Sequence, residues 1–505
     1  PPPPPPPPHF QAEDGIRDKQ ICLVGSEMCI RDRIWRISED TPSGSFPQYL
    51  SETNFYADLA DLTPNPGGHF YDPNLRFWSD HAEKVRWFLV EEDADTVGFS
   101  EDDPWSYPEG MIWVKHFDYP TQWETFSETI GGQLFSGRRP LPGSASKRIE
   151  TRLLVRNATG SYGISYRWNN LNSGPQTDAV LVSNNGEPLE VDITVDGSPA
   201  TATWEIPSRS TCLVCHTPQA GHALSFNTRQ LNTAGEISGQ SGNLLEVLRD
   251  AGYLAGFLGE GSERPRHLTP DDDTYSLEAR VRSYLDVNCS YCHKSGGTGG
   301  GAWDARDHLT LAETNLINTV PADAPVNPGD LIVIPGSVNQ SILYNRLAAI
   351  NGYTRMPPVA TEVIDVEGAQ LLADWIASEL QSELTYEAWR LATFGSSTSP
   401  RGEPGANPDG DTRNNYFEWL TNTNPLNAAS AWVPDFDVSG GQVSVSFEGL
   451  GNRSVTVLRS QDLQNWSPWA APGNDGIPLS PLLQHMLSAP QDSPESYFKF
   501  RIEER

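Results

Sequence analysis

The sequence predicts a multidomain α+β chain: a β-rich N-terminal module, then a mainly helical domain, then a small antiparallel β-domain. Alternating apolar and polar residues, broken by Gly, Pro and Asn, fill residues 34–210. A helical period marks residues 271–380, and strict alternation returns in residues 430–505. Because side chains alternate across a strand but recur about every 3.6 residues on a helix, these patterns separate the three regions.

The clearest strand of the N-terminal module is residues 161–168, SYGISYRW. Its alternation gathers large side chains on one face: Tyr162, Ile164, Tyr166 and Trp168. The runs 179–183 and 189–197 follow at hairpin distances. We therefore expect a β-rich module over residues 34–210, and a separate segment, residues 211–270, around the first of two cysteine motifs.

Two amphipathic helices are predicted at the ends of residues 271–380. The first carries its apolar residues on one face: Leu277, Val281, Tyr284 and Leu285. The second follows Asp365, which suits a helix N-cap. Its apolar stripe is suited to pack against the first helix: Leu372, Trp375, Ile376 and Leu380. The two helices bracket a loop-rich middle and predict a compact helical domain.

Residues 395–425 have the Gly, Pro and Asp content of a linker. The strands predicted beyond it gather apolar residues on one face: Val443, Val445, Phe447, Phe498, Phe500 and Ile502. This pattern predicts a β-sandwich-like domain over residues 430–505.

The first 33 residues do not resemble a protein domain. PPPPPPPP is followed by FQAEDGIRD and CLVGSEMCIRDR, which resemble translated sequencing-adapter read-through and carry no signal-peptide pattern. We therefore expect residues 1–33 to be unstructured and artefactual, and the export signal to be lost with the native N-terminus. Without Cys22 and Cys29, four of the six cysteines remain.

The net charge of −31, from 35 basic and 66 acidic residues, argues against nucleic acid, whose phosphates require a basic face. A solvated acidic surface or a cationic partner is compatible with it. No apolar run approaches the roughly 20 residues of a membrane span, so no transmembrane segment is expected.

The four remaining cysteines stand in two C-x-x-C-H motifs, the first and second cysteine motifs: Cys212, Cys215 and His216, then Cys289, Cys292 and His293. Zinc is disfavoured because the motifs lie 289 − 215 = 74 residues apart, against about 15–20 in a zinc ribbon. A thioredoxin-like pair needs a βαβ unit, which the pattern lacks. Covalent haem explains both thiols and the adjacent proximal histidine, and it places the protein outside the cytoplasm. A local disulfide or zinc remains the alternative at the first motif.

Met356 is the predicted sixth ligand of the second haem. It lies 356 − 293 = 63 residues past the proximal histidine, and Pro357 and Pro358 restrict the backbone beside it. Methionine is a known axial ligand that raises the reduction potential of haem iron.

The stretches CSYCHKSGGTGGG, VIPGSVNQSILYNRL and RMPP resemble a class I cytochrome c domain. Residues 45–380 are similar to a bacterial family of dihaem c-type cytochromes, on the stretches 77–87, 115–117, 149–156 and 207–217. The resemblance implies two covalent haems, electron transfer outside the cytoplasm, and the ligands Cys212, Cys215, His216, Cys289, Cys292, His293 and Met356. One residue departs from the pattern, because His81 stands where Gly is expected.

The sixth ligand of the first haem has three candidates. His116 lies on a predicted strand and fits the KHF stretch of the family. His222 is only six residues past His216 (222 − 216) and would hardly reach the opposite face of the ring; Met111 is the third choice. His116 could equally be a half-buried strand residue, and an open iron could bind peroxide or another small ligand.

Residues 407–418, NPDGDTRNNYFE, resemble the single-helix calcium loops of bacterial surface-protein linkers. The predicted ligands are Asn407, Asp409, Asp411, the Arg413 carbonyl, Asn415 and Glu418. Thr412 at the glycine position and Asn at the start depart from the pattern. A solvated acidic turn is the alternative.

The sequence thus predicts a periplasmic or extracellular dihaem c-type cytochrome with two covalent haem c groups and a calcium loop. It would transfer single electrons to or from a redox partner protein, such as a dehydrogenase or another cytochrome. Two alternatives remain: a dihaem peroxidase or oxidase with one open iron, and a surface binding protein acting through its C-terminal β-domain.

Overall fold

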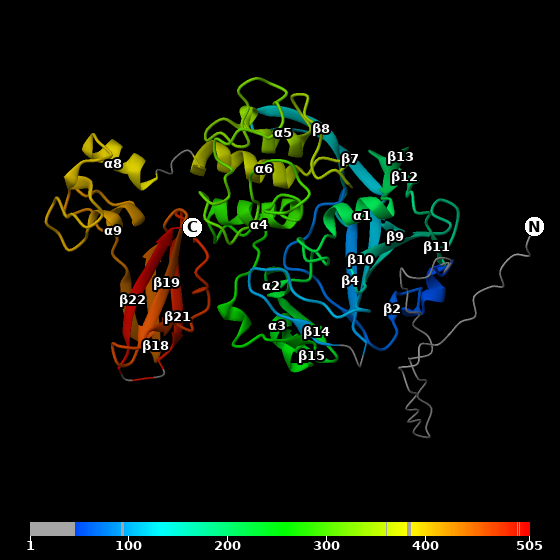
Figure 1. The fold of residues 1–505 in the computed structure, drawn as a ribbon, viewed down its shortest axis with the longest axis horizontal. Coiled ribbons are helices and arrows are strands. Elements are labelled where there is room, and N and C mark those ends of the chain that lie inside the picture. Colours follow the sequence, from blue (N-terminus) through cyan, green and yellow to red (C-terminus); the bar gives the residue numbers. More distant parts are fainter. Residues whose placement is uncertain are drawn as a thin grey trace, which may run out of the picture.

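The structure is a computed structural model that describes residues 46–91, 95–359, 361–380, 385–491, 493 and 495–504. The expected artefact, residues 1–33 with Cys22 and Cys29, lies outside the described residues. Figure 1 shows a large sheet on one side of the molecule and the C-terminal strands on the other side. The helix α4 lies near the middle of the molecule, with α5 and α6 above it.

A six-stranded antiparallel sheet forms the centre of the N-terminal region. Its strands, in spatial order, are β11 (Ala179–Leu181), β10 (Ser161–Trp168), β9 (Ser146–Arg156), β6 (Ile112–Pro120), β4 (Glu83–Leu89) and β3 (Gly68–Phe70). The face predicted for β10 is confirmed, because Tyr162, Ile164, Tyr166 and Trp168 all lie in one buried cluster. The opposite face of this sheet carries the first cysteine motif.

A second sheet, of four strands, packs beside the first. Its order is β13 (Ser198–Ile206), β12 (Glu187–Val195), β7 (Gln122–Ile130) and β8 (Gln133–Pro140). Short elements complete this region: η2 (Leu50–Thr53), β1 (Tyr56–Asp58), β2 (Thr63–Pro64) and β5 (Val97–Gly98). Trp123 and Trp204 of the second sheet share a core with Phe117 of β6, which joins the two sheets.

The segment around the first cysteine motif is short and irregular. It contains α1 (Arg209–Cys215), α2 (Thr228–Leu231), β14 (Ala234–Ile237), β15 (Gln240–Asn243), α3 (Leu244–Asp250), β16 (Leu254–Ala255) and η3 (Gly261–Glu263). The Ser208 side chain accepts a hydrogen bond from the Thr211 N–H, 3.1 Å away, and so begins α1.

Residues 271–380 contain α4 (Leu277–Cys289), η4 (Val338–Gln340), α5 (Ile342–Ala348), α6 (Val366–Asp374) and the π-helical turn η5 (Trp375–Glu379). The predicted N-cap is confirmed, because the Asp365 carboxylate accepts the Gly368 N–H at 2.9 Å. The helices share their core with Phe126, Ile130 and Phe135 of β7 and β8. They therefore pack against the four-stranded sheet rather than only against one another.

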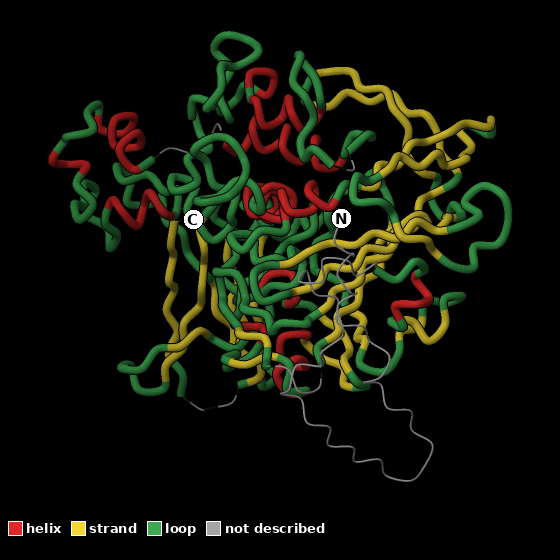
Figure 2. Tube along the Cα trace, turned by 45° about the vertical axis from the view of Figure 1, so that its right-hand side comes forward, coloured by secondary structure: helices red, strands yellow, loops and turns green. Residues whose placement is uncertain are grey.

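The prediction of a mainly helical, cytochrome c-like domain is wrong. The described chain is mostly β, with 31% strand and 18% helix in eight short helices, and it shows no such domain. Figure 2 shows the helices separated by long loops. Residues 290–337 are rich in Gly, Pro and Asn, which do not sustain a continuous helix, so α4 and α5 are joined by turns. The correct description is a β-rich protein with short helices.

The C-terminal region begins with α8 (Tyr386–Phe394), η6 (Pro400–Gly402) and α9 (Asn415–Leu420). Two three-stranded sheets follow: β17 (Asp435–Ser439), β18 (Gln442–Glu448) and β21 (Gln484–Pro490), then β20 (Ser467–Pro468), β19 (Arg453–Ser460) and β22 (Tyr497–Glu504). Val443, Val445 and Phe447 lie in their shared core, as their alternation predicts. None of the helices in the described part of the chain has the length and hydropathy of a membrane span.

Candidate functional site

The first cysteine motif lies against the six-stranded sheet. Cys212 and Cys215 are on the short helix α1, which packs on β10. Gly163 of β10 makes this approach possible, because a Cβ at that position would lie 3.3 Å from Cys212 Sγ. The Cys212 thiol therefore faces the sheet across a narrow space.

His216 is oriented by the chain that follows it. Its Nδ1 lies 2.5 Å from the His222 carbonyl oxygen, to which it donates, so the lone pair of the neutral ring is on Nε2. Burial lowers the pKa of His216 to about 4. A neutral imidazole whose Nδ1–H is fixed by a carbonyl has the arrangement typical of a metal ligand.

The second cysteine motif follows α4 directly. The His293 N–H donates to the Cys289 carbonyl at 2.9 Å, which continues the helical turn through the motif. The His293 ring stacks on Trp303, with 4.4 Å between centroids. A Cβ on Gly297 would lie 2.2 Å from the Cys292 carbonyl oxygen, so the glycine loop wraps closely around the motif.

The fold brings the two motifs into contact. Cys215 Sγ and Cys292 Sγ lie 3.9 Å apart, and the Thr298 hydroxyl donates to the Val214 carbonyl at 2.8 Å. The hydrogen bond with Cys215 lowers the pKa of Cys292. A separation of 74 residues in sequence (289 − 215) therefore becomes a contact between side chains.

The contact between the motifs raises again the question of zinc. A structural zinc site brings four ligands around one point. Among the described residues, only two clusters place three acidic, histidine or cysteine ligand atoms within 4.8 Å of one another, and neither contains a cysteine. The cysteines therefore meet as a pair, not as a metal tetrahedron.

A cavity of about 210 Å³ opens beside the first motif. Cys212, Cys215 and His216 line it together with large aromatic and apolar side chains: Phe77, Trp78, Trp113, Leu153, Leu154 and Tyr291. Pro357 and Pro358 line its far side. The cavity therefore lies between the sheet, α1, α4 and the segment that follows Met356.

Met356 is connected to the second motif through Arg346. Its N–H donates to the Arg346 carbonyl at 3.0 Å, and the positive charge of Arg346 contributes, after burial, to lowering the pKa of His293. Met356 and His293 are thus neighbours of one arginine, and the ligand assignment of Met356 stays a prediction.

His116 is not brought to the cavity. Its Nδ1 lies 2.8 Å from the Thr151 hydroxyl and its Nε2 lies 3.2 Å from an Asp118 carboxylate oxygen, so both ring nitrogens have partners. The ring is fully buried and packs edge-on against Trp168, on the sheet face opposite to α1. Both ring nitrogens of His116 are thus engaged within the sheet, and His116 is not among the residues that line the cavity.

The other two candidates have structural roles. Met111 is fully buried in a cluster with Trp113 and Phe226. The His222 ring contacts the Ser161 hydroxyl at 3.0 Å, while its carbonyl orients His216. His81 has φ +61, in the left-handed region that favours Gly, and its ring packs on Trp78 with 4.5 Å between centroids.

Sequence reasoning missed a set of cations on the same sheet face as the cavity. Arg86, Lys115 and Arg152 line the cavity, on β4, β6 and β9. A signal was present for two of them, because Arg86 stands between Val85 and Trp87 and Lys115 follows an apolar run. The strand of Arg152 is rich in charged residues and carries no such signal. Burial and the charges of Arg86 and Lys84 hold the pKa of Lys115 well below its usual value.

The predicted calcium loop forms a compact acidic cluster. Oxygen atoms of Asp409, Asp411 and Glu418 lie within 4.8 Å of one another. Glu418 is fully buried, and neither of its carboxylate oxygens has a hydrogen-bond partner among the described residues. Burial, then Asp409 and Asp411, raise the pKa of Glu418 to about 7.

Asn415 and Asn407 behave differently in this loop. Asn415 is also fully buried; its amide donates to the carbonyls of Arg401 and Glu403, at 2.6 and 2.9 Å, which leaves its side-chain oxygen without a partner in the described structure. Asn407 instead accepts the Gly410 N–H at 2.8 Å. The chain turns at Gly410, with φ +79, and not at the predicted position of Thr412.

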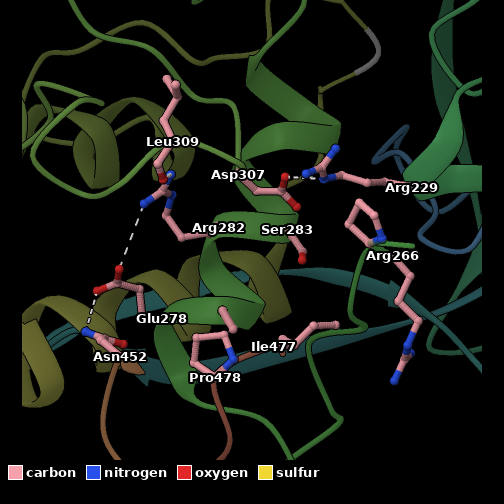
Figure 3. Close-up of a pocket in the computed structure, with 12 residues that line it drawn as sticks. Arg229, Arg266, Glu278, Arg282, Ser283, Asp307, Leu309, Asn452, Ile477 and Pro478 are labelled. Carbon is pink, nitrogen blue, oxygen red and sulfur yellow. Dashed lines mark hydrogen bonds and ion pairs between the residues drawn. The ribbon is translucent and has the colours of Figure 1, made fainter. Parts of the chain in front are cut away.

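A third region has clustered charged side chains, but its cavity is too small for a ligand. Between α4 and the C-terminal sheets, Glu278 binds Asn452 at 2.7 Å and Arg229 binds Asp307 at 2.5 Å (Figure 3). The cavity there is about 30 Å³, which holds a few waters at most. We interpret this cluster as a structural contact between α4 and the C-terminal sheets.

Comparison with family models, with curated proteins and with solved structures finds no match to this chain. The resemblance to dihaem cytochromes therefore depends on the two cysteine motifs and their surroundings. Their geometry is the basis of the proposal that follows.

Proposed function

We propose that this protein is a dihaem c-type electron-transfer protein that works outside the cytoplasm. One observation carries the proposal: two C-x-x-C-H motifs distant in sequence meet with 3.9 Å between Cys215 Sγ and Cys292 Sγ. Each motif follows a helical turn, and His216 has its Nδ1 engaged by a carbonyl, as a proximal ligand requires.

The residues of the two motifs have distinct roles in this proposal. Cys212 and Cys215 hold the first haem by thioether bonds, and Cys289 and Cys292 hold the second. In each bond the sulfur adds to one carbon of a vinyl group and the thiol proton goes to the other, with no net oxidation. His216 and His293 would hold the irons from the proximal side, and Met356 would supply a further ligand to the second iron. The bound irons supply one-electron storage.

The cavity beside the first motif fits an aromatic ligand that is only partly enclosed. Its volume of about 210 Å³ is below the roughly 300–1,000 Å³ of most small-molecule sites. A porphyrin held at Cys212 and Cys215 would therefore extend past the cavity toward solvent. An exposed edge suits exchange of electrons with a redox partner protein.

The contact between the motifs suits electron transfer within the molecule. Attachment of both haems would bring the porphyrin edges at Cys215 and Cys292 close together. An electron on one haem would then disfavour reduction of the other, because like charges repel strongly where little water intervenes. A redox titration should therefore show two separated steps.

The alternative of a dihaem peroxidase or oxidase has one supporting observation. His116 and Met111 do not line the cavity, and the His222 carbonyl orients His216. The sixth position of the first iron would then be open to a small ligand. Turnover of hydrogen peroxide by the reduced protein would favour this alternative.

The haem proposal is tested by expressing the full chain together with haem-maturation machinery. We expect the intact mass to include two haems, and acid–acetone extraction to leave the colour with the protein. A mass without these increments, or extraction of the pigment, would refute the proposal.

We also propose that residues 407–418 bind calcium. The supporting observation is the buried Glu418 carboxylate, which faces Asp409 and Asp411 with neither oxygen hydrogen-bonded in the described structure. Three converging carboxylates suit a hard cation that prefers oxygen ligands. Without a cation, this buried cluster would be costly.

Calorimetric titration of the full chain with CaCl₂ tests the calcium proposal. Glu418→Gln should weaken binding at least tenfold, whereas the control Glu387→Gln, at an exposed site on α8, should not. Because the pKa of Glu418 is raised to about 7, a proton competes with the ion below that pH, and affinity should fall by up to about tenfold per pH unit. Absence of binding heat in the wild type would contradict the proposal.

A further inference from the structure

The sheet face beside the first cysteine motif carries a row of like charges. Arg86 on β4 is directly opposite Lys115 on β6, and Lys115 is directly opposite Arg152 on β9. Three neighbouring strands thus place three cations side by side, on the face that lines the cavity. Like charges directly opposite one another destabilise a sheet, so this row requires a compensating anion.

The protein compensates only part of this charge. Arg152 forms a two-pronged pair with Glu150, at 2.6 and 2.7 Å. Arg86 is 2% exposed; Asp72, its ion-pair partner, is 3.7 Å away and half-exposed, and the two terminal nitrogens of Arg86 have no hydrogen-bond acceptor among the described residues.

Lys115 has aromatic rings as neighbours in place of a carboxylate. Its ammonium lies 5.4 Å from the centre of the Phe77 ring and 4.9 Å from that of Phe117. Ring faces attract a cation, but they do not neutralise it.

The cations of the cavity lining are not equally compensated. Arg152 is paired with Glu150, Arg86 has an Asp72 carboxylate oxygen at 3.7 Å, and Lys115 faces aromatic rings. Lys84, on the same strand as Arg86, donates to the Phe77 carbonyl at 2.7 Å and has Asp80 as an acidic neighbour. Cations without a close counterion are costly in a cavity, so Arg86 and Lys115 are suited to receive negative charge.

We propose that Arg86 and Lys115 hold the two carboxylates of the porphyrin attached at Cys212 and Cys215. This inference rests on the proposed haem function and adds the residues that receive the polar edge of the group. The rest of the cavity is aromatic and apolar, so its lining matches a ligand with an aromatic body and an anionic edge. Arg86 can bind a carboxylate through two N–H groups, and Lys115 binds as a point charge.

Reduction potentials of the haem-loaded protein test this inference. Arg86→Gln and Lys115→Gln should each lower the potential of one haem by roughly 59 mV, a tenfold change in its reduction equilibrium, because a nearby positive charge stabilises the reduced state. The propionate bending bands in resonance Raman spectra should shift in the same variants. Arg86→Lys should retain most of the potential, since it keeps the charge.

Arg167→Gln is the matched control. Arg167 lies on β10 of the same sheet but pairs with Glu187, with a 41% exposed side chain. Its removal should change neither the potential nor the propionate bands. The inference would be overturned if Arg86→Gln and Lys115→Gln changed neither the potentials nor the propionate bands while intact mass showed both haems attached. That result would leave the haem function standing. A wild type without haem would instead overturn the function, and this inference with it.

A free oxyanion could fill the same row of cations. Titration of the oxidised wild type with nitrite distinguishes a free anion from the porphyrin carboxylates. If the porphyrin carboxylates already occupy Arg86 and Lys115, nitrite should cause no spectral change that depends on Lys115. A saturable spectral change that Lys115→Gln abolishes would show that the row holds a free anion, and would overturn the assignment to the porphyrin.

Discussion

The first cysteine motif lies at the end of a helix of seven residues that packs on a β-sheet, whereas the second begins at the last residue of a helix of thirteen residues and continues into glycine-rich loops. The first faces an aromatic cavity with cations in its lining, and the second has its histidine stacked on Trp303. The same five-residue pattern therefore occurs in two different electrostatic environments. Because surroundings set the potential of a haem, the two sites should differ in potential.

The largest expected effect separates the two motifs completely. Cys212→Ala with Cys215→Ala should remove one haem and leave the other, and Cys289→Ala with Cys292→Ala should do the reverse. Each motif carries its own pair of thiols and its own histidine, so removal of one pair leaves the other attachment site in place. Intact mass and the haem-to-protein ratio measure the outcome; loss of both haems from either variant would show that the motifs are not independent.

A second prediction concerns His116, which lies on the sheet face opposite to the first motif. His116→Ala should leave the spectrum and potentials of both haems unchanged. It should cost about 1–3 kcal/mol of unfolding free energy, since Thr151 and Asp118 lose a buried partner. Denaturant unfolding and a redox titration of the same preparation measure both effects. A changed visible spectrum would restore His116 as a ligand.

A third prediction tests the sixth ligand of the second haem. Met356→Ala should lower the reduction potential of that haem by at least about 59 mV, because a thioether ligand raises the potential. This shift corresponds to a tenfold change in the equilibrium constant for reduction. Met486→Ala is the control, as Met486 is 68% exposed on β21. A potential that does not move in Met356→Ala would exclude the assignment.

The smallest expected effect concerns the stacking at the second motif. Trp303→Phe should keep both haems and cost about 1 kcal/mol of unfolding free energy, because the ring that packs on His293 becomes smaller. Thermal unfolding of the haem-loaded protein measures the change. Loss of the second haem in this variant would mean that Trp303 is needed for attachment.

The mainly helical domain expected over residues 271–380 shows where prediction from the sequence was wrong. Its two best helices exist, and Asp365 caps the second as expected. Between them the Gly- and Pro-rich chain forms turns, and β7 and β8 supply part of the core. Amphipathic periodicity predicted each helix but not its partner, since an apolar stripe does not specify which surface covers it.

The sequence by itself determined features that depend on local pattern. These are the strand face of Tyr162 to Trp168, the two cysteine motifs, and the convergence of Asp409, Asp411 and Glu418. These features depend on residues close in the chain. Only the tertiary structure decided which distant groups meet. It brought Cys215 to Cys292, turned His116 away from the cavity, and aligned Arg86, Lys115 and Arg152 across three strands. Strand register and sheet face determine these contacts, and both depend on the packing of the whole domain.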